Sequence, residues 1–360
     1  MNLKIGSAQI KLLETLCAAT GVAGNEGAVR KAVLEALGDA AADHTIDALG
    51  NLLVIRKGTR RGRRLRVMVA AHMDEAGLMV TGDDKDGIYK FETVGGLSPA
   101  QLVGKHVVVG KDRIAGVIGF KPIHLTTASE RTSGVSLDSL RIDTGGAANG
   151  KVKIGDRAAF SPNFAVLGSG RTRTLRAKAL DDRLGVATLI ELVRNPPDNV
   201  DLLAGFTTQE EIGVRGAYVA ANALDPDLAV VLDCTPAYDL PHWEEDEENT
   251  RYNTRLGAGP AIYIADKGTL SDPRLVRHFS ETAETAGLPF QFRQAGGGGT
   301  DASGIHKSRA GVPSISISVP GRYLHTAASI ARVSDWQAAL QLVHAALSGM
   351  NPSLLSLERA

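Results

Sequence analysis

The feature that most limits how this chain can fold is a set of three apolar segments, each followed closely by acidic or histidine side chains. The segments cover residues 67–71, 200–207 and 228–232. Near-continuous apolar runs of this length are typical of strands in a parallel sheet, because helices cover both faces of such a sheet. We therefore predict that all three segments form buried strands of one α/β domain.

Helical patterns alternate with these segments, as expected for the α/β class. Apolar side chains recur at helical spacing in residues 8–19 and 184–193, and Gly38 closes a helical pattern that starts near residue 25. The other expected helices cover 272–286, 334–348 and a segment after Val214, and the other expected strands cover 45–47, 51–55, 290–294 and 314–319, the last being the final strand.

One stretch interrupts this alternation. Residues 82–170 contain short strand-like runs, turns rich in Gly, Asp and Asn, and no long helical pattern. The runs cover residues 88–92, 106–109, 114–120, 140–143 and 158–161. We therefore expect residues 82–170 to form a β-rich domain inserted into an α/β domain made of residues 1–81 and 171–360. Residues 107–109 and 117–120 are expected to leave apolar surface that such a small domain does not bury by itself.

The composition excludes several classes of protein. Lysine plus arginine equals aspartate plus glutamate, 40 of each, so net charge favours neither nucleic acid nor a membrane surface. Only 4% of the residues are aromatic, which argues against stacking platforms for sugars or bases. Residues 57–66 (basic) and 244–248 (acidic) are expected to be solvated loops.

The expected location of the protein is the cytoplasm. The two cysteines, Cys17 and Cys234, are too few for a disulfide framework and fit a reducing compartment. No apolar run approaches the roughly 18 residues that a membrane span needs. Residues 1–9 lack the apolar core of a signal peptide.

The first apolar segment ends in a motif that suits metal chemistry. Residues i and i+2 of a strand lie on the same side, so His72 could bind a metal while Asp74 accepts a hydrogen bond from its other ring nitrogen. The alternative is a histidine that is satisfied at a strand end beside a turn aspartate. For one such motif in isolation, that alternative is the more common.

Two pairs of adjacent carboxylates follow. In the pair Asp181–Asp182, at the start of a helix, the two side chains point in different directions, and we interpret Asp181 as a carboxylate that bridges two metal ions. An N-cap is the commoner role for acidic residues there. In the pair Glu210–Glu211, one carboxylate could bind a metal and its neighbour could act as general base toward an activated water, although a polar loop is the simpler interpretation.

Two further candidates lie at the ends of predicted strands. Asp233 follows the strand at 228–232, and His325 follows the strand at 314–319. Sites in open α/β sheets gather at the carboxyl ends of strands, so these residues are expected near His72 and Glu211. The glycine-rich stretch 296–299 lacks the Lys-Ser/Thr of a phosphate-binding loop, which argues against nucleotide binding.

Taken together, these motifs resemble the glutamyl aminopeptidase and deblocking aminopeptidase family of co-catalytic metallo-aminopeptidases, some members of which carry an endoglucanase label. The resemblance covers essentially the whole chain. It includes Ala71-His72-Met73-Asp74-Glu75, Ala179-Leu180-Asp181-Asp182-Arg183, Gln209-Glu210-Glu211-Ile212-Gly213, Val231-Leu232-Asp233, Gly298-Gly299-Thr300-Asp301-Ala302 and Arg322-Tyr323-Leu324-His325. It implies a three-layer α/β/α catalytic domain with an inserted small β-barrel domain.

The resemblance also implies a role for each residue. Asp181 would bridge two divalent metal ions, of which His72 and Asp233 would complete one site and Glu211 and His325 the other. Glu210 would be the general base, Asp74 would support His72, and Asp182 would shape the turn. Oxygen and nitrogen ligands suit Zn, Co or Mn. One metal ion could also hold a free α-amino group.

The resemblance therefore implies a metalloprotease that removes N-terminal residues from short peptides. It further implies self-association into dimers through the inserted domain, and into dodecamers. A metal-dependent deacylase of small N-acyl compounds could use the same ligands and stays open as an alternative. A glycosidase is disfavoured because its carboxylate pair usually works beside aromatic platforms, and a catalytically idle binding protein does not need Glu210.

Overall fold

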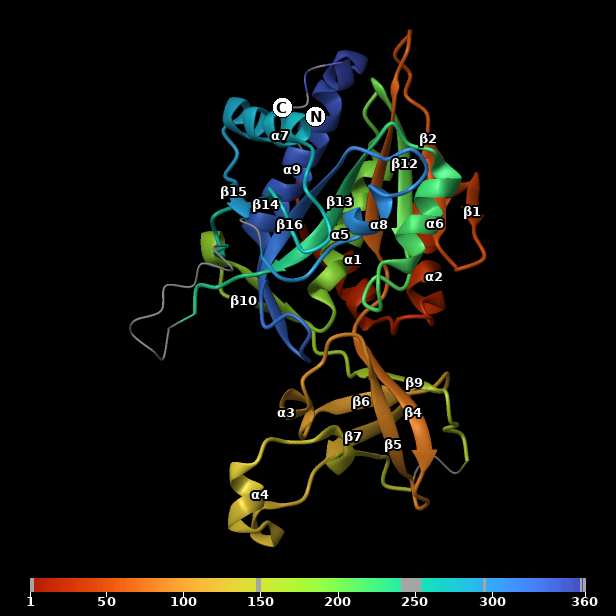
Figure 1. Cartoon of the computed structure of the whole chain (residues 1–360), viewed down its shortest axis with the longest axis vertical. Coiled ribbons are helices and arrows are strands. Elements are labelled where there is room, and N and C mark those ends of the chain that lie inside the picture. The colour runs from red at the N-terminus through yellow and green to blue at the C-terminus, as the bar shows by residue number, and fades with distance from the viewer. Residues whose placement is uncertain (1–2, 147–149, 241–253, 294–295, 357, 359–360) are drawn as a thin grey trace.

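The computed structural model describes residues 3–146, 150–240, 254–293, 296–356 and 358. The acidic stretch 244–248 and the last residue of the expected strand 290–294 lie outside these residues. Figure 1 shows a large α/β body above a smaller body made of strands, with the chain entering and leaving the smaller one at the junction between them.

A mixed sheet forms the centre of the large body. Among the described residues its main path runs β1-β2-β12-β3-β13-β16-β17-β11-β10, and β14 adds to β16 and carries β15. The strands are β1 (His44–Ile46), β2 (Leu52–Arg56), β3 (Leu65–His72), β10 (Ala165–Leu167), β11 (Thr174–Ala177), β12 (Val200–Thr207), β13 (Leu228–Pro236), β14 (Ala261–Tyr263), β15 (Gln291–Arg293), β16 (Ser314–Arg322) and β17 (Ser329–Arg332). β12, β3, β13 and β16 are parallel neighbours. The three apolar segments are therefore buried strands at the middle of the sheet, as predicted.

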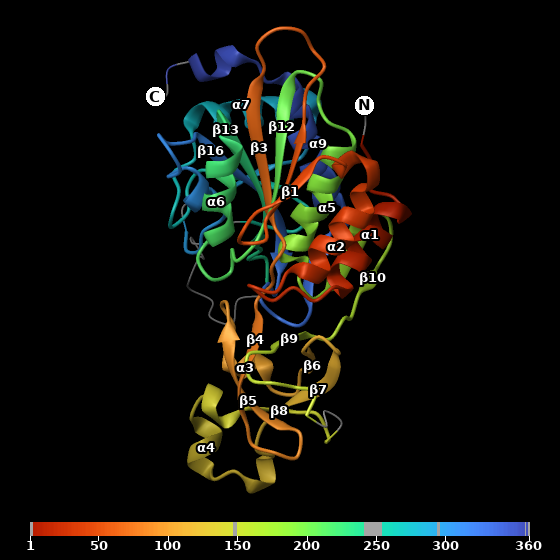
Figure 2. The ribbon, with the colours of Figure 1, turned by 90° about the vertical axis from the view of Figure 1, so that its right-hand side faces the viewer.

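Helices cover both faces of this sheet. They are α1 (Ser7–Ala18), α2 (Gly27–Leu37), α5 (Leu180–Arg194), α6 (Arg215–Leu224), α7 (Pro273–Ala286), α8 (Ala302–Ile305) and α9 (Val333–Gly349). Val67, Val69 and Ala71 of β3 pack into the core with α1, α2, α5, α7 and α9, whereas Met68 and Ala70 pack into a second core with α6 and α8. Figure 2 shows α6 on one side of the sheet and α1, α2 and α5 on the other. The α/β/α prediction is confirmed.

The smaller body is a closed antiparallel barrel with a core of its own. Its strands are β4 (Gly77–Asp83), β5 (Ile88–Val94), β6 (His106–Val109), β7 (Ile114–Gly119), β8 (Arg141–Asp143) and β9 (Arg157–Phe160), in the order β4-β5-β8-β7-β6-β9. Two short helices, α3 (Pro99–Leu102) and α4 (Ala128–Thr132), lie among them. The inserted barrel is confirmed, but the expected apolar surface at residues 107–109 is not, since Val107 and Val109 are buried in the barrel core.

The remaining elements are short. The 3-10 helices are η1 (Gly38–Ala41), η2 (Ile123–Leu125), η3 (Leu137–Ser139), η4 (Gly170–Thr172) and η5 (Pro352–Ser356). The expectation that residues 314–319 are the final strand is wrong, because the chain turns back after β16 and pairs β17 against it. No helix in the described part of the chain combines the length and the apolar character that crossing a membrane requires.

Candidate metal centre

β3 carries His72 to the carboxyl edge of the sheet. His72 is the last residue of β3, and its side chain is 3% exposed. The next residue, Met73, donates its N–H to the carbonyl of Thr207 over 2.7 Å. This hydrogen bond keeps the end of β3 beside the end of β12, which leads to the pair Glu210–Glu211.

Asp74 connects these two strand ends. One of its carboxylate oxygens accepts the N–H of Glu210 over 3.0 Å, and the other accepts the N–H of Glu211 over 3.1 Å. The expected hydrogen bond from His72 is not formed, because Nδ1 of His72 lies 3.6 Å from Oδ1 of Asp74, an ion-pair distance. Asp74 therefore fixes the backbone of the glutamate pair, a role that the sequence did not indicate.

The start of α5 turns Asp181 and Asp182 in different directions. Both have non-helical dihedral angles, and the peptide bond between them is cis. Oδ1 of Asp182 accepts the N–H of Gly185 over 2.9 Å inside the protein, whereas Asp181 faces the cleft. The two neighbouring carboxylates thus have separate surroundings.

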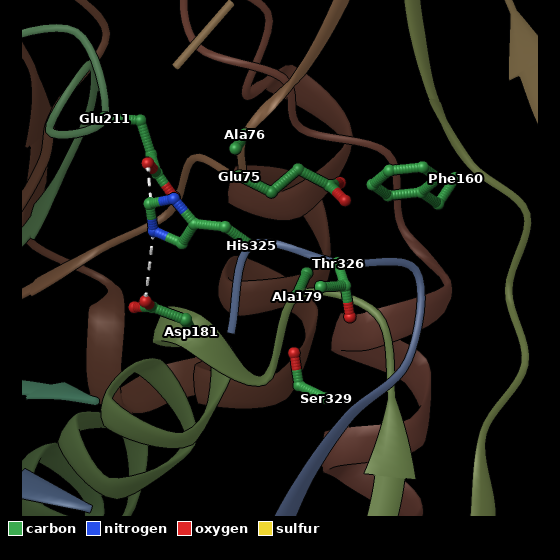
Figure 3. A pocket seen from close by; sticks show the side chains of 9 residues that line it. All are labelled: Glu75, Ala76, Phe160, Ala179, Asp181, Glu211, His325, Thr326 and Ser329. Atoms are coloured by element: carbon green, nitrogen blue, oxygen red, sulfur yellow. Dashed lines mark ion pairs between the residues drawn. The ribbon is translucent and has the colours of Figure 1, made fainter. Parts of the chain in front are cut away.

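Asp181 lies between two histidines. Its Oδ1 is 3.3 Å from Nε2 of His72, and its Oδ2 is 3.5 Å from Nε2 of His325. Asp233 stands 3.8 Å from the same nitrogen of His72, and Glu211 stands 3.4 Å from the same nitrogen of His325. Figure 3 shows His325 between Asp181 and Glu211, with dashed lines for both ion pairs.

These residues form two groups that could each hold a metal ion. His72, Asp181 and Asp233 form one, Asp181, Glu211 and His325 form the other, and in each group the ligand atoms lie within 4.8 Å of one another. The donors are imidazole nitrogens and carboxylate oxygens, a set that suits Zn, Co or Mn. The residues present therefore fit two divalent ions that share Asp181. A third group pairs Asp181 and Asp182 with Cys234, but the Cys234 thiol donates to the carbonyl of Leu180 and burial raises its pKa, which disfavours the thiolate that a metal would bind.

The pKa values of the side chains in these two groups reflect how closely their charges are packed. Burial raises the pKa of Glu211 and of Asp233 to about 7. Burial alone would lower the pKa of His325, but its ion pair with Asp181 and the charge of Glu211 raise it to about 10. Burial would likewise raise the pKa of Asp181, yet the two histidines lower it. Carboxylates this close together favour bound protons or a bound cation.

Glu210 stands apart from both groups. It lines the cleft beside His72 and Asp233 but belongs to neither set of candidate ligands among the described residues. Burial raises its pKa well above the ordinary value for glutamate. A carboxylate that lies beside two groups of candidate ligands without belonging to either could take a proton from a nearby water.

A cleft of about 540 Å³ opens over the two groups. It is also lined by residues that the sequence did not single out, including Tyr263 and Arg293. Arg293 stacks on Tyr263, with its guanidinium carbon 4.3 Å from the ring centroid, and donates to the carbonyl of Gly297 over 2.8 Å. The charge of Arg293 gave no sequence signal, because an isolated arginine is normally exposed.

A buried ionic cluster supports the turn at Asp181. Nζ of Lys178 lies 2.8 Å from both carboxylate oxygens of Glu75, and Nη2 of Arg183 lies 3.4 Å from one of them. Lys178 and Arg183 are fully buried. Arg183 also donates to the carbonyls of Met73 and Asp74, so the cluster ties the end of β3 to the start of α5.

Histidine and carboxylate side chains converge at the carboxyl edge of a sheet that helices cover on both faces, and a barrel is inserted directly after β3. This combination of fold and site defines a metal-dependent peptide hydrolase. The family model for M42 glutamyl aminopeptidase matches residues 50–342. The chain belongs to this family, and its activity is therefore that of an aminopeptidase.

Known relatives agree with this assignment. A putative aminopeptidase of Acetivibrio thermocellus is 33% identical over 338 residues, which is 92% of this chain and 96% of that protein. The crystal structure of a TET aminopeptidase from a marine sediment archaeon of the Thaumarchaeota has a TM-score of 0.90 and 31% identity, and the match covers 97% of this chain and 98% of that one. A TET1 peptidase of Pyrococcus horikoshii, described as able to assemble into a tetrahedron or a large octahedral shell, has a TM-score of 0.82 and 31% identity. The match covers 95% of this chain and 100% of that one.

Proposed function

We propose that the protein removes N-terminal residues from short peptides with two divalent metal ions, Zn or Co and alternatively Mn, and with Glu210 as general base. The observation that carries this proposal is the carboxylate of Asp181, whose two oxygens face different histidines at 3.3 and 3.5 Å. Sharing one carboxylate between two ions is the arrangement of co-catalytic metal sites.

Each candidate residue has a distinct task in this proposal. His72 and Asp233 would hold one ion, Glu211 and His325 would hold the other, and Asp181 would supply an oxygen to each. Bound divalent ions supply Lewis acidity, which polarises the scissile carbonyl and makes a water molecule more acidic. Glu210 takes a proton from the attacking water and delivers it to the departing amine, a role that its place in the cleft beside His72 and Asp233 supports.

Asp74 acts on the position of the glutamates. Because it accepts the N–H groups of both Glu210 and Glu211, it keeps the base and the neighbouring ligand at fixed places relative to His72. Asp182 shapes the turn that aims Asp181 at the cleft, since its own carboxylate is bound to the backbone of α5.

The alternative is a metal-dependent deacylase of small N-acyl compounds, and the two activities differ in what they require of the substrate. An aminopeptidase needs a free α-amino group, whereas a deacylase needs that nitrogen acylated. We therefore suggest assaying leucyl-, glutamyl- and N-acetyl-leucyl-p-nitroanilide side by side. The proposal predicts release of p-nitroaniline from one or both free-amine substrates and none from the acetylated compound. Release of acetate from the acetylated compound, with its anilide bond left intact, would favour the deacylase.

We further propose that the α/β body, expected from the sequence at residues 1–81 and 171–360, is the catalytic domain and that the insert, expected at 82–170, mediates self-association in the cytoplasm. In the structure the barrel already begins with β4 at Gly77, and β10 (Ala165–Leu167) belongs to the large sheet. The exposed apolar side chains Ile123 and Leu125, which are 71% and 63% exposed, support this use of the insert. A dimer is the minimal assembly, and a dodecamer is the larger one, which the related PhTET1-12s structure, a dodecamer in the asymmetric unit, suggests.

A further inference from the structure

We propose that the inserted barrel supplies part of the metal centre itself. The backbone carbonyl of Gly96, in the loop between β5 and α3, positions the ring of His325 and thereby sets the metal affinity of the group made by Asp181, Glu211 and His325. Gly96 is a positioning residue, because it acts through His325. The inference rests on the proposed metal-dependent function and adds a part of the chain that this function does not otherwise use.

The contact is a hydrogen bond from the ring to the loop. Nδ1 of His325 lies 2.9 Å from the carbonyl oxygen of Gly96, which can only accept. Nδ1 must therefore carry the hydrogen, and Nε2 is left as the nitrogen that faces Asp181 and Glu211. Histidines that bind metals usually donate their second ring nitrogen in this way, which fixes both the tautomer and the orientation of the ring.

The orientation of the His325 ring depends on this one hydrogen bond, whereas the orientation of the His72 ring is fixed by its burial. His72 is at the end of a buried strand and its side chain is 3% exposed, whereas the side chain of His325 is 38% exposed. His325 also lies in the connection between β16 and β17, where its own φ is +56° and that of Tyr323 is +58°. An exposed ring on an irregular connection needs an external partner to keep one orientation.

The loop approaches this closely because residues 95 and 96 are both glycines. A Cβ atom at Gly96 would stand 3.2 Å from Nδ1 of His325, and one at Gly95 would stand 3.3 Å from Cβ of Glu211. Gly95 also has a φ of +91°, which residues with a side chain rarely adopt. Two side chains of one candidate metal group therefore leave little room for a side chain at either glycine.

The other group is built without the barrel loop. His72 and Asp233 come from β3 and β13, which are parallel neighbours in the central sheet. A small displacement of the loop at residues 95–96 should therefore disturb one metal site and spare the other. This selectivity separates a positioning role from a general effect on folding.

The test is a metal titration of the Gly96→Ala variant. Zn²⁺ is added to chelator-stripped protein in competition with a chromophoric chelator, so that two binding steps are resolved in the wild type. We expect Gly96→Ala to weaken one step by about 10- to 100-fold, the usual effect of losing an outer partner of a metal-binding histidine, and to leave the other step unchanged. His325→Ala identifies which step belongs to this group.

Gly119→Ala is the matched control, because it changes a glycine of the same barrel whose Cβ would meet no atom closer than 3.8 Å. The Zn²⁺ affinities of both binding steps in this variant should equal those of the wild type. Replacing His325 by Nδ1-methylhistidine removes the donor without changing residue 96 itself, and it should weaken the same step even if Gly96→Ala does not fold.

The outcomes distinguish this inference from the proposed function. Wild-type binding in two steps, with Gly96→Ala and the methylhistidine variant unchanged in both, would overturn the role of Gly96 alone. Equal weakening of both steps would also overturn it. A wild-type protein that binds no Zn²⁺ would instead overturn the metal-dependent function on which the inference rests.

Discussion

Oδ1 of Asp181 lies 3.3 Å from Nε2 of His72, although 109 positions separate the two residues in the chain. The contact forms because β3 ends and α5 begins at the same edge of the sheet, and because Arg183 donates to the carbonyls that follow His72. The second oxygen of Asp181 remains directed at His325. The proposed pair of metal sites depends on both oxygens of this carboxylate, one facing His72 and the other facing His325.

The first prediction concerns the general base. Glu210→Gln keeps the size of the side chain but removes its ability to take a proton, so kcat should fall by about 10²- to 10⁴-fold. Because Glu210 belongs to neither group of candidate ligands, the variant should retain the metal content of the wild type. Steady-state kinetics with leucyl-p-nitroanilide and elemental analysis of the same sample check both parts.

Glu211→Gln is the matched comparison, since it makes the same change one position further along the chain. Its carboxylate stands 3.4 Å from His325, so its loss should weaken metal binding, and added metal should recover part of the activity. Equal loss of metal from both variants would mean that the roles of the two glutamates are wrongly assigned.

The second prediction concerns the buried ionic cluster. Lys178→Met removes one of the two cations that neutralise Glu75, and breaking a buried ion pair in this way typically costs about 3–5 kcal/mol. We expect a loss of that order in the free energy of unfolding by urea, measured on chelator-stripped protein. A change below about 1 kcal/mol would show that Arg183 alone satisfies Glu75.

Arg274→Met provides the control for this experiment. It breaks a pair with Asp272 that is also largely buried, with side chains 10% and 2% exposed, but that lies at the start of α7. Both variants should lose stability, and only Lys178→Met should also lower the affinity for metal, because only that cluster supports the turn at Asp181.

Much of this site could be predicted from the sequence because two simple rules apply to it. Apolar runs identified β3, β12 and β13 as buried strands, and the carboxyl ends of parallel strands share one edge. Those rules bring His72, Glu211 and Asp233 together. The same reasoning missed β10, β11 and β17, since strands of three or four residues are too short to show a period.

Other parts could not be predicted because they depend on contacts between distant segments. The carbonyl of Gly96 meets a ring 229 positions away, and no side chain marks it. Lys178 and Arg183 are charged, and charged residues are normally exposed unless they are paired. Their partner Glu75 is more than 100 positions earlier, so only the folded structure shows that the three are buried together.

The third prediction is a pH dependence far from the metal centre. Burial lowers the pKa of His344, which is half-buried on α9. Below about pH 6.5 the unfolded chain takes up a proton at this residue that the folded protein resists, so His344 should reduce stability as the pH falls.

His344→Gln should remove that contribution. As the pH is lowered from 7.5 to 5.5, we expect the thermal midpoint of the variant to rise relative to that of the wild type, both measured on chelator-stripped protein. The metal-centre carboxylates titrate in both proteins and cancel in the comparison. A difference that stays constant over this pH range would contradict the lowered pKa.

The fourth prediction concerns assembly. Static light scattering of the metal-loaded protein should give a homo-oligomer, with a dimer as the smallest species and twelve subunits as the largest expected. Ile123→Ser combined with Leu125→Ser should shift the distribution toward smaller species, because both side chains are exposed on η2 of the inserted domain. A monomer mass for the wild type would rule out self-association.

The measurement that tests the central claim most directly is the number of metal ions per subunit in fully active enzyme. We expect elemental analysis to find two divalent ions per subunit, a strong chelator to remove both ions together with the activity, and Zn or Co to restore both. Asp181→Asn should lose both ions, since its carboxylate is shared by the two groups. Full activity with one ion per subunit, or with none, would contradict the account.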